Sequence, residues 1–470
     1  MSIKRKFELP LALILAFICY CILYNANWLF VGSMPGDDYQ FLMTTAVGKA
    51  SHGATWSSRF FPLGLSDYSL LLLFGRYGQT ALAHYIWNSI TLVFSCFLLF
   101  EILYNTTKNY LSAYIALLFA FIACGFAQIH MECIYAERMI LFVASIFLFA
   151  IDKAKKSQNI NWYVLAFLFA AYSTYMKELV FVIFLVFAVT QLMFNELSRR
   201  DKVFYTSLII NSLIFVSIYT YRRIFKPRQD IYATVISSVS EISFSQFLNE
   251  PILFFIVTLC AVRAYAVLAK HDRKNLISDA ALFAAVAYAF CYFLLKLHSG
   301  YYLYPSVILS LPAFAVFFNK SRLNLFIGFF SLILCGYLNF STNKYIVIND
   351  WNHRETDHKV FKNIVDKSQK GWKVFWLSDI ADKEKEQYWH YDRIMCFNRF
   401  QHFLKYYNSN TVFPISLVFD TNGFHKNSII IVNEMALGRK SFQNIYDNFK
   451  TFSPKQVAKI NNNLIYEISD

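Results

Sequence analysis

The sequence has few charged residues for its length, and this shortage excludes an ordinary soluble protein. Only 16% of the 470 residues are charged, whereas 57% are hydrophobic and 19% are aromatic. One soluble core could not bury that much apolar surface. The sequence also lacks collagen-like, linker-like and low-complexity segments, and it has no repeat of solenoid period. The composition therefore predicts that the lipid bilayer is the solvent of this chain.

Sequence motifs for metal, disulfide and nucleic-acid binding are missing as well. The nine cysteines are scattered, with no CxxC pair and no Cys/His cluster at metal spacing, and most lie inside apolar runs. This pattern indicates neither a zinc site nor a disulfide framework. The net charge of +14 comes mainly from loops that the positive-inside rule places in the cytoplasm, so we expect no nucleic-acid partner.

Long apolar runs predict a mainly α, polytopic membrane protein of about eleven transmembrane helices, each near the roughly 20 residues that cross a bilayer. The first run follows a basic head, but it is too long for a signal peptide and lacks a small-residue cleavage site, so we expect it to stay uncleaved. The runs lie at residues 9–30, 80–104, 110–127, 139–151, 160–176, 179–195, 203–221, 251–269, 278–297, 302–318 and 324–341.

The loops between these runs alternate in character. With the N-terminus in the cytoplasm, the even loops are short and basic, as the positive-inside rule requires. The odd loops hold nearly all acidic and aromatic-polar clusters, which places these clusters together on the outer face. The first outer loop covers residues 31–79, and its stretch "SDYSLLLLFGRYGQ" predicts a short interfacial helix.

A change to soluble composition at residue 342 predicts a second domain. The stretches "KYIVIND", "KVFWLSD" and "SIIIVNE" are typical of short buried strands. They alternate with the helix-like stretches "HKVFKNIVDKSQ", "RFQHFLKYY" and "SFQNIYDNF". We therefore expect a transmembrane domain at 1–341 and a small extracytoplasmic α/β domain at 342–470.

Two adjacent carboxylates, Asp37 and Asp38, open the first outer loop. A carboxylate at a partly desolvated membrane interface can have a raised pKa and act as a general base on a hydroxyl group. A second carboxylate beside it can orient an acceptor or hold a divalent cation. A solvated turn or a helix N-cap is the alternative, since Pro-Gly-Asp-Asp is also good turn chemistry.

Two short acid–base motifs lie in later outer loops. The motif "YAER" contains Glu137 and Arg138, and "YMKE" contains Lys177 and Glu178. Arg138 suits an anionic phosphate, with Glu137 holding it or the acceptor in place. Charges between two spans are costly unless they line a polar cavity, which makes Lys177 and Glu178 candidates too. An ordinary ion pair and snorkelling to the headgroups are the alternatives.

Basic and aromatic residues of other outer loops complete the candidate site. The loop "YRRIFKPR" departs from the positive-inside trend, so its cations are expected to contact lipid headgroups or the phosphate of a lipid-linked donor. The stretch "KLHSGYYLYP" is typical of a phosphate or sugar subsite, or of an interfacial aromatic belt. From these loops and "SSRFFPLG", the candidates for donor phosphate and sugar binding are Arg59, Arg222, Arg223, His298, Tyr301 and Tyr302. For Arg59, an anchor of its own loop is the alternative.

The joint placement of these motifs resembles the GT-C superfamily of polytopic glycosyltransferases, which use sugars linked to polyprenyl phosphate. The resemblance is carried by Asp37 and Asp38, by "YAER", by the "KE" of "YMKE" and by "YYLYP", and it covers residues 1–341. An extracytoplasmic C-terminal α/β domain is also common in that superfamily. In organisation the chain looks most similar to bacterial Gtr-like and aminoarabinose-transferase-like enzymes.

The resemblance implies a reaction and its partners. Asp37 would be the general base that deprotonates an acceptor hydroxyl, which then attacks the anomeric carbon with inversion, and Asp38 would orient the acceptor or a metal. The donor would be a polyprenyl-phosphate-linked sugar, and the acceptor a lipopolysaccharide, another surface glycan or a lipid. The metal is unknown, and a divalent cation, Mg or Mn, is the one cofactor left open. The expected location is the bacterial cytoplasmic (inner) membrane.

Two other functions remain open. A lipid-linked oligosaccharide flippase or transporter would also have many spans, but such proteins often show internal repeats and charges near the bilayer midplane. This sequence has no repeat, and its charges gather at one face. A surface-glycan polymerase would carry its main catalytic loop late in the membrane part, whereas the Asp pair lies in the first loop.

Overall fold

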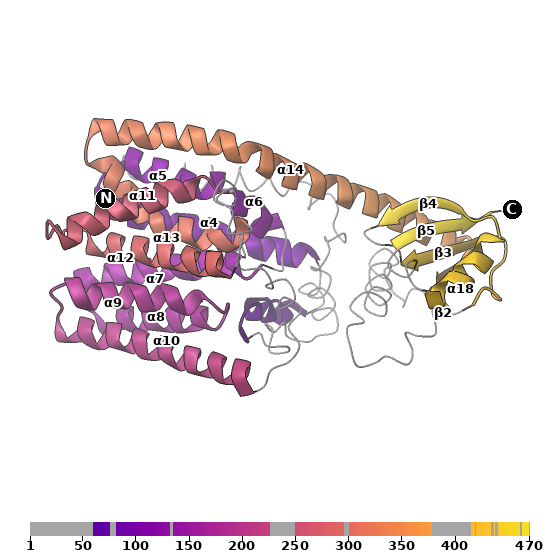
Figure 1. The fold of residues 1–470 in the computed structure, drawn as a ribbon, viewed down its shortest axis with the longest axis horizontal. Coiled ribbons are helices and arrows are strands. Elements are labelled where there is room, and N and C mark those ends of the chain that lie inside the picture. Colours follow the sequence, from indigo (N-terminus) through magenta and orange to yellow (C-terminus); the bar gives the residue numbers. More distant parts are fainter. Residues whose placement is uncertain are drawn as a thin grey trace. The chain divides into compact units, whose positions relative to one another are not determined.

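The computed structural model describes residues 60–75, 81–131, 135–225, 250–295, 300–377, 415–418, 420–433, 437, 440–460 and 463–469. These residues fall into two compact units. Of the described residues, the first contains Ala83–Val347 together with residues 60–75, and the second contains those from Ile348 onward together with Ala81 and Leu82. The first unit is helical, whereas the second combines a sheet with helices (Figure 1).

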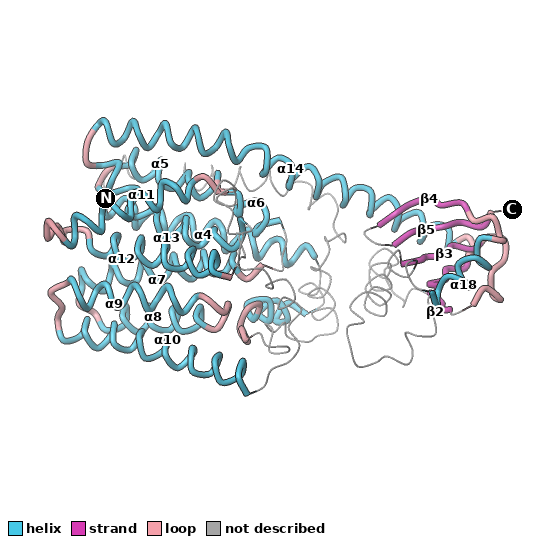
Figure 2. The backbone as a smooth tube through the Cα atoms, in the orientation of Figure 1, coloured by secondary structure: helices cyan, strands magenta, loops and turns pink. Residues whose placement is uncertain are grey.

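The helices of the first unit follow the predicted apolar runs. Every predicted run from the second onward overlaps one helix or a bent helix pair, and the run at 9–30 lies outside the described residues. Figure 2 shows these helices in cyan and the described loops between them in pink. They are α4 (Ala81–Thr107), α5 (Tyr110–Ile122), α6 (Cys124–Met131), α7 (Glu137–Ser157), α8 (Ile160–Thr174), α9 (Val180–Phe194), α10 (Arg199–Phe225), α11 (Ile252–Leu268), α12 (Leu276–Leu294), α13 (Gly300–Asn319) and the start of α14 (Arg322–Gln369).

Within the described part of the chain, five helices are long and apolar enough to cross a membrane, namely α4, α10, α12, α13 and the first part of α14. The bent pair α5 and α6 would make a sixth span. Helices α8, α9 and α11 are apolar but shorter. The protein is therefore a polytopic membrane protein, and the total of eleven spans stays a prediction.

Asparagine side chains cap the N-termini of two of these helices, each of which follows a short connection. Asn109 Oδ1 accepts from the N–H groups of Leu111 and Ser112 at 2.9 and 3.3 Å and so caps α5. Asn159 caps α8 through the N–H of Asn161 at 2.9 Å. Such caps satisfy backbone donors that the first helical turn leaves without partners. The chain can therefore reverse within a few residues.

A buried carboxylate holds the break between α5 and α6. The two helices meet at 66°, with Ala123 extended between them. Glu250 accepts from the Cys124 N–H at 2.8 Å and from Asn339 Nδ2 at 3.1 Å. Asn339 also donates to the Ile122 carbonyl at 2.9 Å. These bonds satisfy backbone groups that the break removes from the helical ladder. Burial raises the pKa of Glu250 to about 7.

Helix α13 is the buried centre of the first unit. It packs against α12, α5, α6 and α7. Ser306 Oγ on α13 donates to the Ala285 carbonyl of α12 at 2.8 Å. Where α13 begins, a side chain at Gly125 of α6 would collide with the carbonyl oxygen of Gly300. This close approach brings the first residues of α13 next to α6.

The second unit is built on a five-stranded mixed sheet with the order β2-β1-β3-β5-β4. Strand β1 pairs in parallel with β2 and β3, whereas β5 is antiparallel to β3 and β4. Phe442 and Phe449 of α18 (Lys440–Lys450) pack against Phe375, Val432 and Tyr466 of the sheet. The strands are β1 (Lys373–Leu377), β2 (Ile415–Val418), β3 (Ser428–Asn433), β4 (Lys455–Ile460) and β5 (Asn463–Ile468).

Two of the three predicted strands are present, and one prediction is wrong. Strands β1 and β3 fall in "KVFWLSD" and "SIIIVNE", whereas "KYIVIND" at 344–350 is helical, inside α14. A short apolar run fits either element by periodicity, and here it extends a helix that has already begun. Helix α14 also continues through the predicted boundary between 341 and 342.

The remaining elements of the second unit were predicted in part. The stretches "HKVFKNIVDKSQ" and "SFQNIYDNF" are helical as predicted, and "RFQHFLKYY" lies outside the described residues. Strands β2, β4 and β5 were not predicted. Strand β2 has only four residues, and β4 is largely exposed and polar at the edge of the sheet, so neither shows a clear apolar pattern.

Candidate functional site

The described end of the predicted first outer loop, residues 60–75, places an acid inside the helical unit. It contains η1 (Ser66–Phe74), a 3-10 helix. Asp67 in its first turn is buried, whereas Leu73 and Phe74 at its end are exposed. The short helix expected in "SDYSLLLLFGRYGQ" is therefore present, but its first turn faces the protein.

Asp67 and Arg138 form the first of two buried ion pairs. Arg138 Nη2 donates to Asp67 Oδ2 at 2.7 Å, and Trp87 Nε1 of α4 donates to the same oxygen at 2.7 Å. The side chains of Arg138 and Asp67 are only 1% and 3% exposed. Charges buried this deeply are tolerated when they are paired and hydrogen-bonded. The pair therefore ties η1 to the start of α7 and to α4.

The guanidinium of Arg138 also lies over an aromatic ring. Its Cζ is 4.1 Å from the ring centroid of Tyr68, which is a cation–π contact. The hydroxyl of Tyr68 donates to Asn88 Oδ1 of α4 at 3.1 Å, and its ring packs against His84 at 4.7 Å. Arg138 is thus fixed in position by groups from η1 and α4.

Glu137 and Lys177 form the second ion pair. Lys177 Nζ lies 3.0 Å from Glu137 Oε1, and the two side chains are 10% and 0% exposed. Glu137 and Arg138 are neighbours in α7, so the two pairs lie beside each other at one end of the helical unit. Within the described residues, Asp67 Oδ1 and Glu137 Oε2 are buried without a hydrogen-bond partner. Such atoms mark positions where a ligand or water would bind.

Tyrosines surround the second ion pair. Lys177 Nζ is 5.2 Å from the ring centroid of Tyr302, which stacks on Tyr292 at 4.7 Å. Tyr301 contacts Tyr302 at 4.0 Å and Tyr135 at 4.3 Å. These rings come from the start of α13, the end of α12 and the segment before α7. They offer flat apolar faces beside an ammonium group, which suits a sugar ring next to a phosphate.

The pair Phe60 and Phe61 links Lys177 with Arg222 of α10. Lys177 Nζ lies 5.7 Å from the Phe61 ring centroid, and Arg222 Cζ lies 5.0 Å from that of Phe60. Phe60 also contacts Phe215 of α10 at 5.8 Å. Arg222 therefore lies at the same end of the helical unit as the two ion pairs.

The structure brings together most of the predicted site residues that it describes, namely Glu137, Arg138, Lys177, Arg222, Tyr301 and Tyr302. Glu178 follows Lys177 and interacts electrostatically with Tyr288 and Tyr292 of α12. The side chain of Arg223 is not described, and Asp37, Asp38, Arg59 and His298 lie outside the described residues.

The described residues form no metal centre. They contain no group of three or more His, Cys, Asp or Glu side chains that could hold an ion. Whether Asp37 and Asp38 hold Mg or Mn stays open, because both residues lie outside the described part of the chain.

Several site residues were not predicted. Asp67 is a single acid before an apolar run, and Trp87 is one aromatic residue in a long span. One signal in the sequence could have identified Asp67. An acid directly before the apolar stretch "YSLLLLF" needs a cationic partner if that stretch lies at a membrane. Tyr292 lies on a helix where an aromatic residue is ordinary core. The sequence alone gives no sign that it adjoins the charged residues.

The arrangement can bind an anionic group that carries a sugar. Lys177 is the more accessible cation, with 10% of its side chain exposed against 1% for Arg138. Its ammonium group can approach a phosphate, while the ion pair with Glu137 orients it. Arg138, held by Asp67 and Tyr68, fixes the end of α7 that carries Glu137.

The helices and their composition define the class, which is a polytopic membrane protein. No family profile and no curated protein matches the sequence. Among solved structures, the chain is similar to the crystal structure of ArnT from Cupriavidus metallidurans bound to undecaprenyl phosphate. The TM-score is 0.52 at 10% sequence identity, and the similarity covers 97% of this chain and 97% of that chain. The chain therefore shares the fold of that structure, and at this identity the likeness establishes the fold alone.

Proposed function

We propose that this protein is a membrane glycosyltransferase that transfers a sugar from a polyprenyl-phosphate donor to a surface glycan or lipid acceptor. The observation that carries the proposal is the buried cluster of two ion pairs and tyrosines at one end of the helical unit. Ionisable groups buried among membrane helices are costly and usually functional. The fold shared with ArnT, whose structure contains undecaprenyl phosphate, supports the same class of donor.

In this proposal the cluster of ion pairs and tyrosines binds the donor. Lys177 contacts the phosphate, Glu137 orients Lys177, and Tyr301 and Tyr302 contact the sugar. Arg222 adds a second cation near Phe60. A cation aimed at the departing phosphate is most effective where water is excluded, because it stabilises charge that develops in the transition state.

Asp37 is the proposed general base. It takes the proton of an acceptor hydroxyl, whose oxygen attacks the anomeric carbon while the bond from that carbon to the phosphate oxygen breaks. The electron pair leaves with the polyprenyl phosphate, and the configuration at the anomeric carbon inverts. Asp38 orients the acceptor. We place this reaction at the outer face of the bacterial cytoplasmic membrane, with the N-terminus in the cytoplasm and the C-terminal domain outside.

The test is sugar transfer by the purified full chain in liposomes, with radiolabelled polyprenyl-phosphate hexoses and extracted surface glycans and lipids. Asp37→Asn is expected to slow transfer by roughly 10²-fold or more, as loss of a general base does. Asp38→Asn is compared with it, and Asp447→Asn, an exposed acid of α18, is the matched control. If both loop variants transfer like wild type, the Asp pair is a turn or cap. Label that crosses the bilayer without covalent transfer would instead identify a flippase.

A further inference from the structure

A cavity of about 310 Å³ lies at the opposite end of the helical unit from the candidate functional site. Helix α7 connects the two places, since it begins at Glu137 and carries Lys155 and Lys156 at its other end, where both line the cavity. The helix rises 1.5 Å per residue, so Glu137 and Lys155 are separated by about 27 Å along its axis. The cavity is therefore separate from the proposed donor site.

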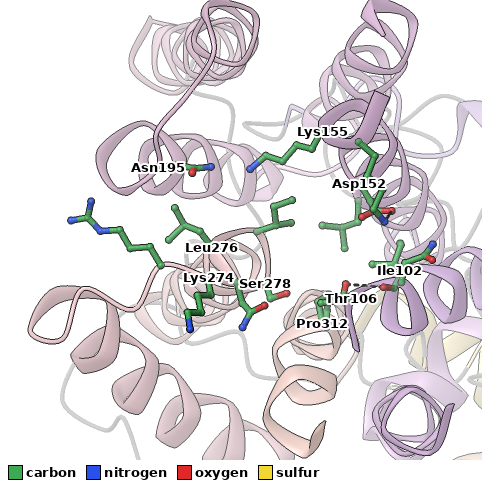
Figure 3. Close-up of a pocket in the computed structure, with 15 residues that line it drawn as sticks. Ile102, Thr106, Asp152, Lys155, Asn195, Lys274, Leu276, Ser278 and Pro312 are labelled. Carbon is green, nitrogen blue, oxygen red and sulfur yellow. Dashed lines mark hydrogen bonds and ion pairs between the residues drawn. The ribbon is translucent and has the colours of Figure 1, made fainter. Parts of the chain in front are cut away.

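Basic side chains outnumber acidic ones in the lining of this cavity. Lys155, Lys156, Arg273 and Lys274 line it, and Asp152 is the one acid in the lining that the structure describes. Lys156 Nζ pairs with Asp152 Oδ2 at 2.6 Å, which compensates that carboxylate. The other three cations therefore leave an excess of positive charge. Figure 3 shows Lys155 and Lys274 on opposite sides of the lining side chains, with Leu276 between them and Ser278 beside Lys274.

Lys155 and Arg273 contact neutral side chains in the described structure, so their charge is available to an anion. Lys155 Nζ donates to Gln191 Oε1, a neutral group, at 3.2 Å. Arg273 lies over the ring of Phe194 with its Cζ 5.8 Å from the centroid, and the Arg273 side chain is exposed. Neither contact removes positive charge from the cavity. Asp201 of α10 also attracts Lys155 electrostatically, but its carboxylate accepts from the hydroxyls of Tyr163 and Ser198, so an anion could bind both cavity cations without breaking a hydrogen bond to a carboxylate.

The N-terminus of helix α12 opens on the same cavity. Asn275, Leu276, Ile277 and Ser278 line it, and Asn275 in the N-cap position makes no side-chain cap hydrogen bond. The first N–H groups of a helix have no intrahelical partners and carry the positive end of its dipole. They form a favourable environment for a phosphate.

Asp279, the acid in the first turn of α12, should repel an anion in the cavity only weakly. Asp279 accepts from Arg263 Nε and Nη2 at 2.7 and 2.8 Å, so its charge is compensated within the protein. Arg263 also donates to Asp272 Oδ2 at 3.0 Å. These bonds join α11, α12 and their connection into one support for the cavity wall.

We propose that this cavity is a binding site for the phosphate group of an anionic ligand. Phosphate oxygens accept charge-assisted hydrogen bonds from Lys155, Arg273 and Lys274, and from the first N–H groups of α12. The phosphate can belong to a lipid headgroup of the adjacent leaflet or to a soluble compound. The site does not depend on the proposed glycosyl transfer, and it lies at the end of the helices that the positive-inside rule predicts to be cytoplasmic.

The test measures the melting temperature of the purified full chain in a neutral detergent. One arm adds a short-chain phosphatidylglycerol, and a second adds inorganic phosphate, with ionic strength held constant by NaCl. The double variant Arg273→Gln/Lys274→Gln removes two exposed cavity cations. The control Arg199→Gln/Lys202→Gln removes one exposed arginine and one exposed lysine at the start of α10, outside the cavity lining. A charge-reversed single variant, Lys274→Glu, covers the case in which the double variant folds poorly.

The expected result is a saturable rise in melting temperature for wild type and for the control in at least one arm. The cavity variants should need roughly tenfold more ligand for the same rise, which corresponds to 1.4 kcal/mol. A response to phosphatidylglycerol alone identifies a lipid headgroup, and a response to both arms identifies a general phosphate site. The proposal is overturned if neither probe gives a saturable rise, or if the control loses binding as much as the cavity variants.

Discussion

The two ends of the helical unit differ in how their charged side chains are paired and how far they are buried. At the end with η1, each cation of the two ion pairs is matched by a carboxylate, and Asp67, Glu137 and Arg138 are almost wholly buried. At the other end, Arg273 and Lys274 are exposed, and the cavity lining has more basic than acidic groups. Burial requires each charge to be paired, whereas access to water permits an excess of one sign. Changes at the first end should therefore alter folding, and changes at the second mainly binding.

The largest expected effect is at the Asp67–Arg138 pair. Arg138→Met should lower the free energy of unfolding by about 3–5 kcal/mol, because it leaves the carboxylate of Asp67 buried without its cation. Asp67→Ala should do the same by stranding Arg138. Unfolding by SDS titration in mixed micelles measures both. The double variant Asp67→Leu/Arg138→Met should lose less than the sum of the single losses, and additive losses would show that the pair is not coupled.

A smaller loss is expected for Lys177, because part of its side chain reaches solvent. Lys177→Met should lower the melting temperature by leaving Glu137 buried and charged. Adding Glu137→Gln should restore most of that loss, since the second change removes the stranded charge. Thermal unfolding of the single and double variants in one detergent checks this order. A double variant that melts below the single variant would contradict the pairing of these two residues.

A third effect concerns the pH dependence of stability at the break between α5 and α6, where Glu250 accepts hydrogen bonds from the Cys124 N–H and from Asn339 Nδ2. Burial raises its pKa from 4.5 to about 7, so the folded protein keeps a proton that the unfolded chain releases. The free energy of unfolding should therefore fall as pH rises from about 4.5 through about 7, and then level off. Glu250→Gln should remove this part of the pH dependence. Melting temperatures of both proteins across this range provide the test, and parallel curves would exclude Glu250 as the source.

The smallest effect is expected at the open end. Lys274→Gln should change the free energy of unfolding by no more than about 0.5 kcal/mol in the absence of phosphate, because an exposed side chain loses little on substitution. SDS titration of this variant beside Arg138→Met compares the two ends directly. A large loss at Lys274 would mean that the cavity cations stabilise the fold, and it would remove the contrast between the ends.

Much of the helical unit could be predicted from the sequence because apolar length is a strong signal. The runs from residue 80 onward fall in helices, and the outer-loop motifs with Glu137, Lys177 and Tyr302 come together at one end. The alternation of loops was enough to predict this grouping, because successive helices that cross in opposite directions place all odd-numbered loops at the same end. Asp37 and Asp38 remain predictions, because they lie outside the described residues.

Partners that depend on three-dimensional packing could not be predicted. Asp67 reaches Arg138 only because η1 turns its first residues toward α7, and nothing in "SDYSLLLL" specifies that direction. Trp87 and Tyr292 look like ordinary residues of apolar helices. The wrong strand at 344–350 has a related cause, because a short apolar run takes the structure of the element that it continues.

The most direct test of the central claim is sugar transfer by the double variant Glu137→Gln/Lys177→Met in liposomes with polyprenyl-phosphate sugars. Lys202→Met, at an exposed position of α10, is the control for a lost lysine. The double variant is expected to melt near wild type but to transfer sugar roughly 10²-fold more slowly, because the departing phosphate has lost its cation. Transfer by the double variant at the wild-type rate would contradict the assignment of this cluster as the donor site.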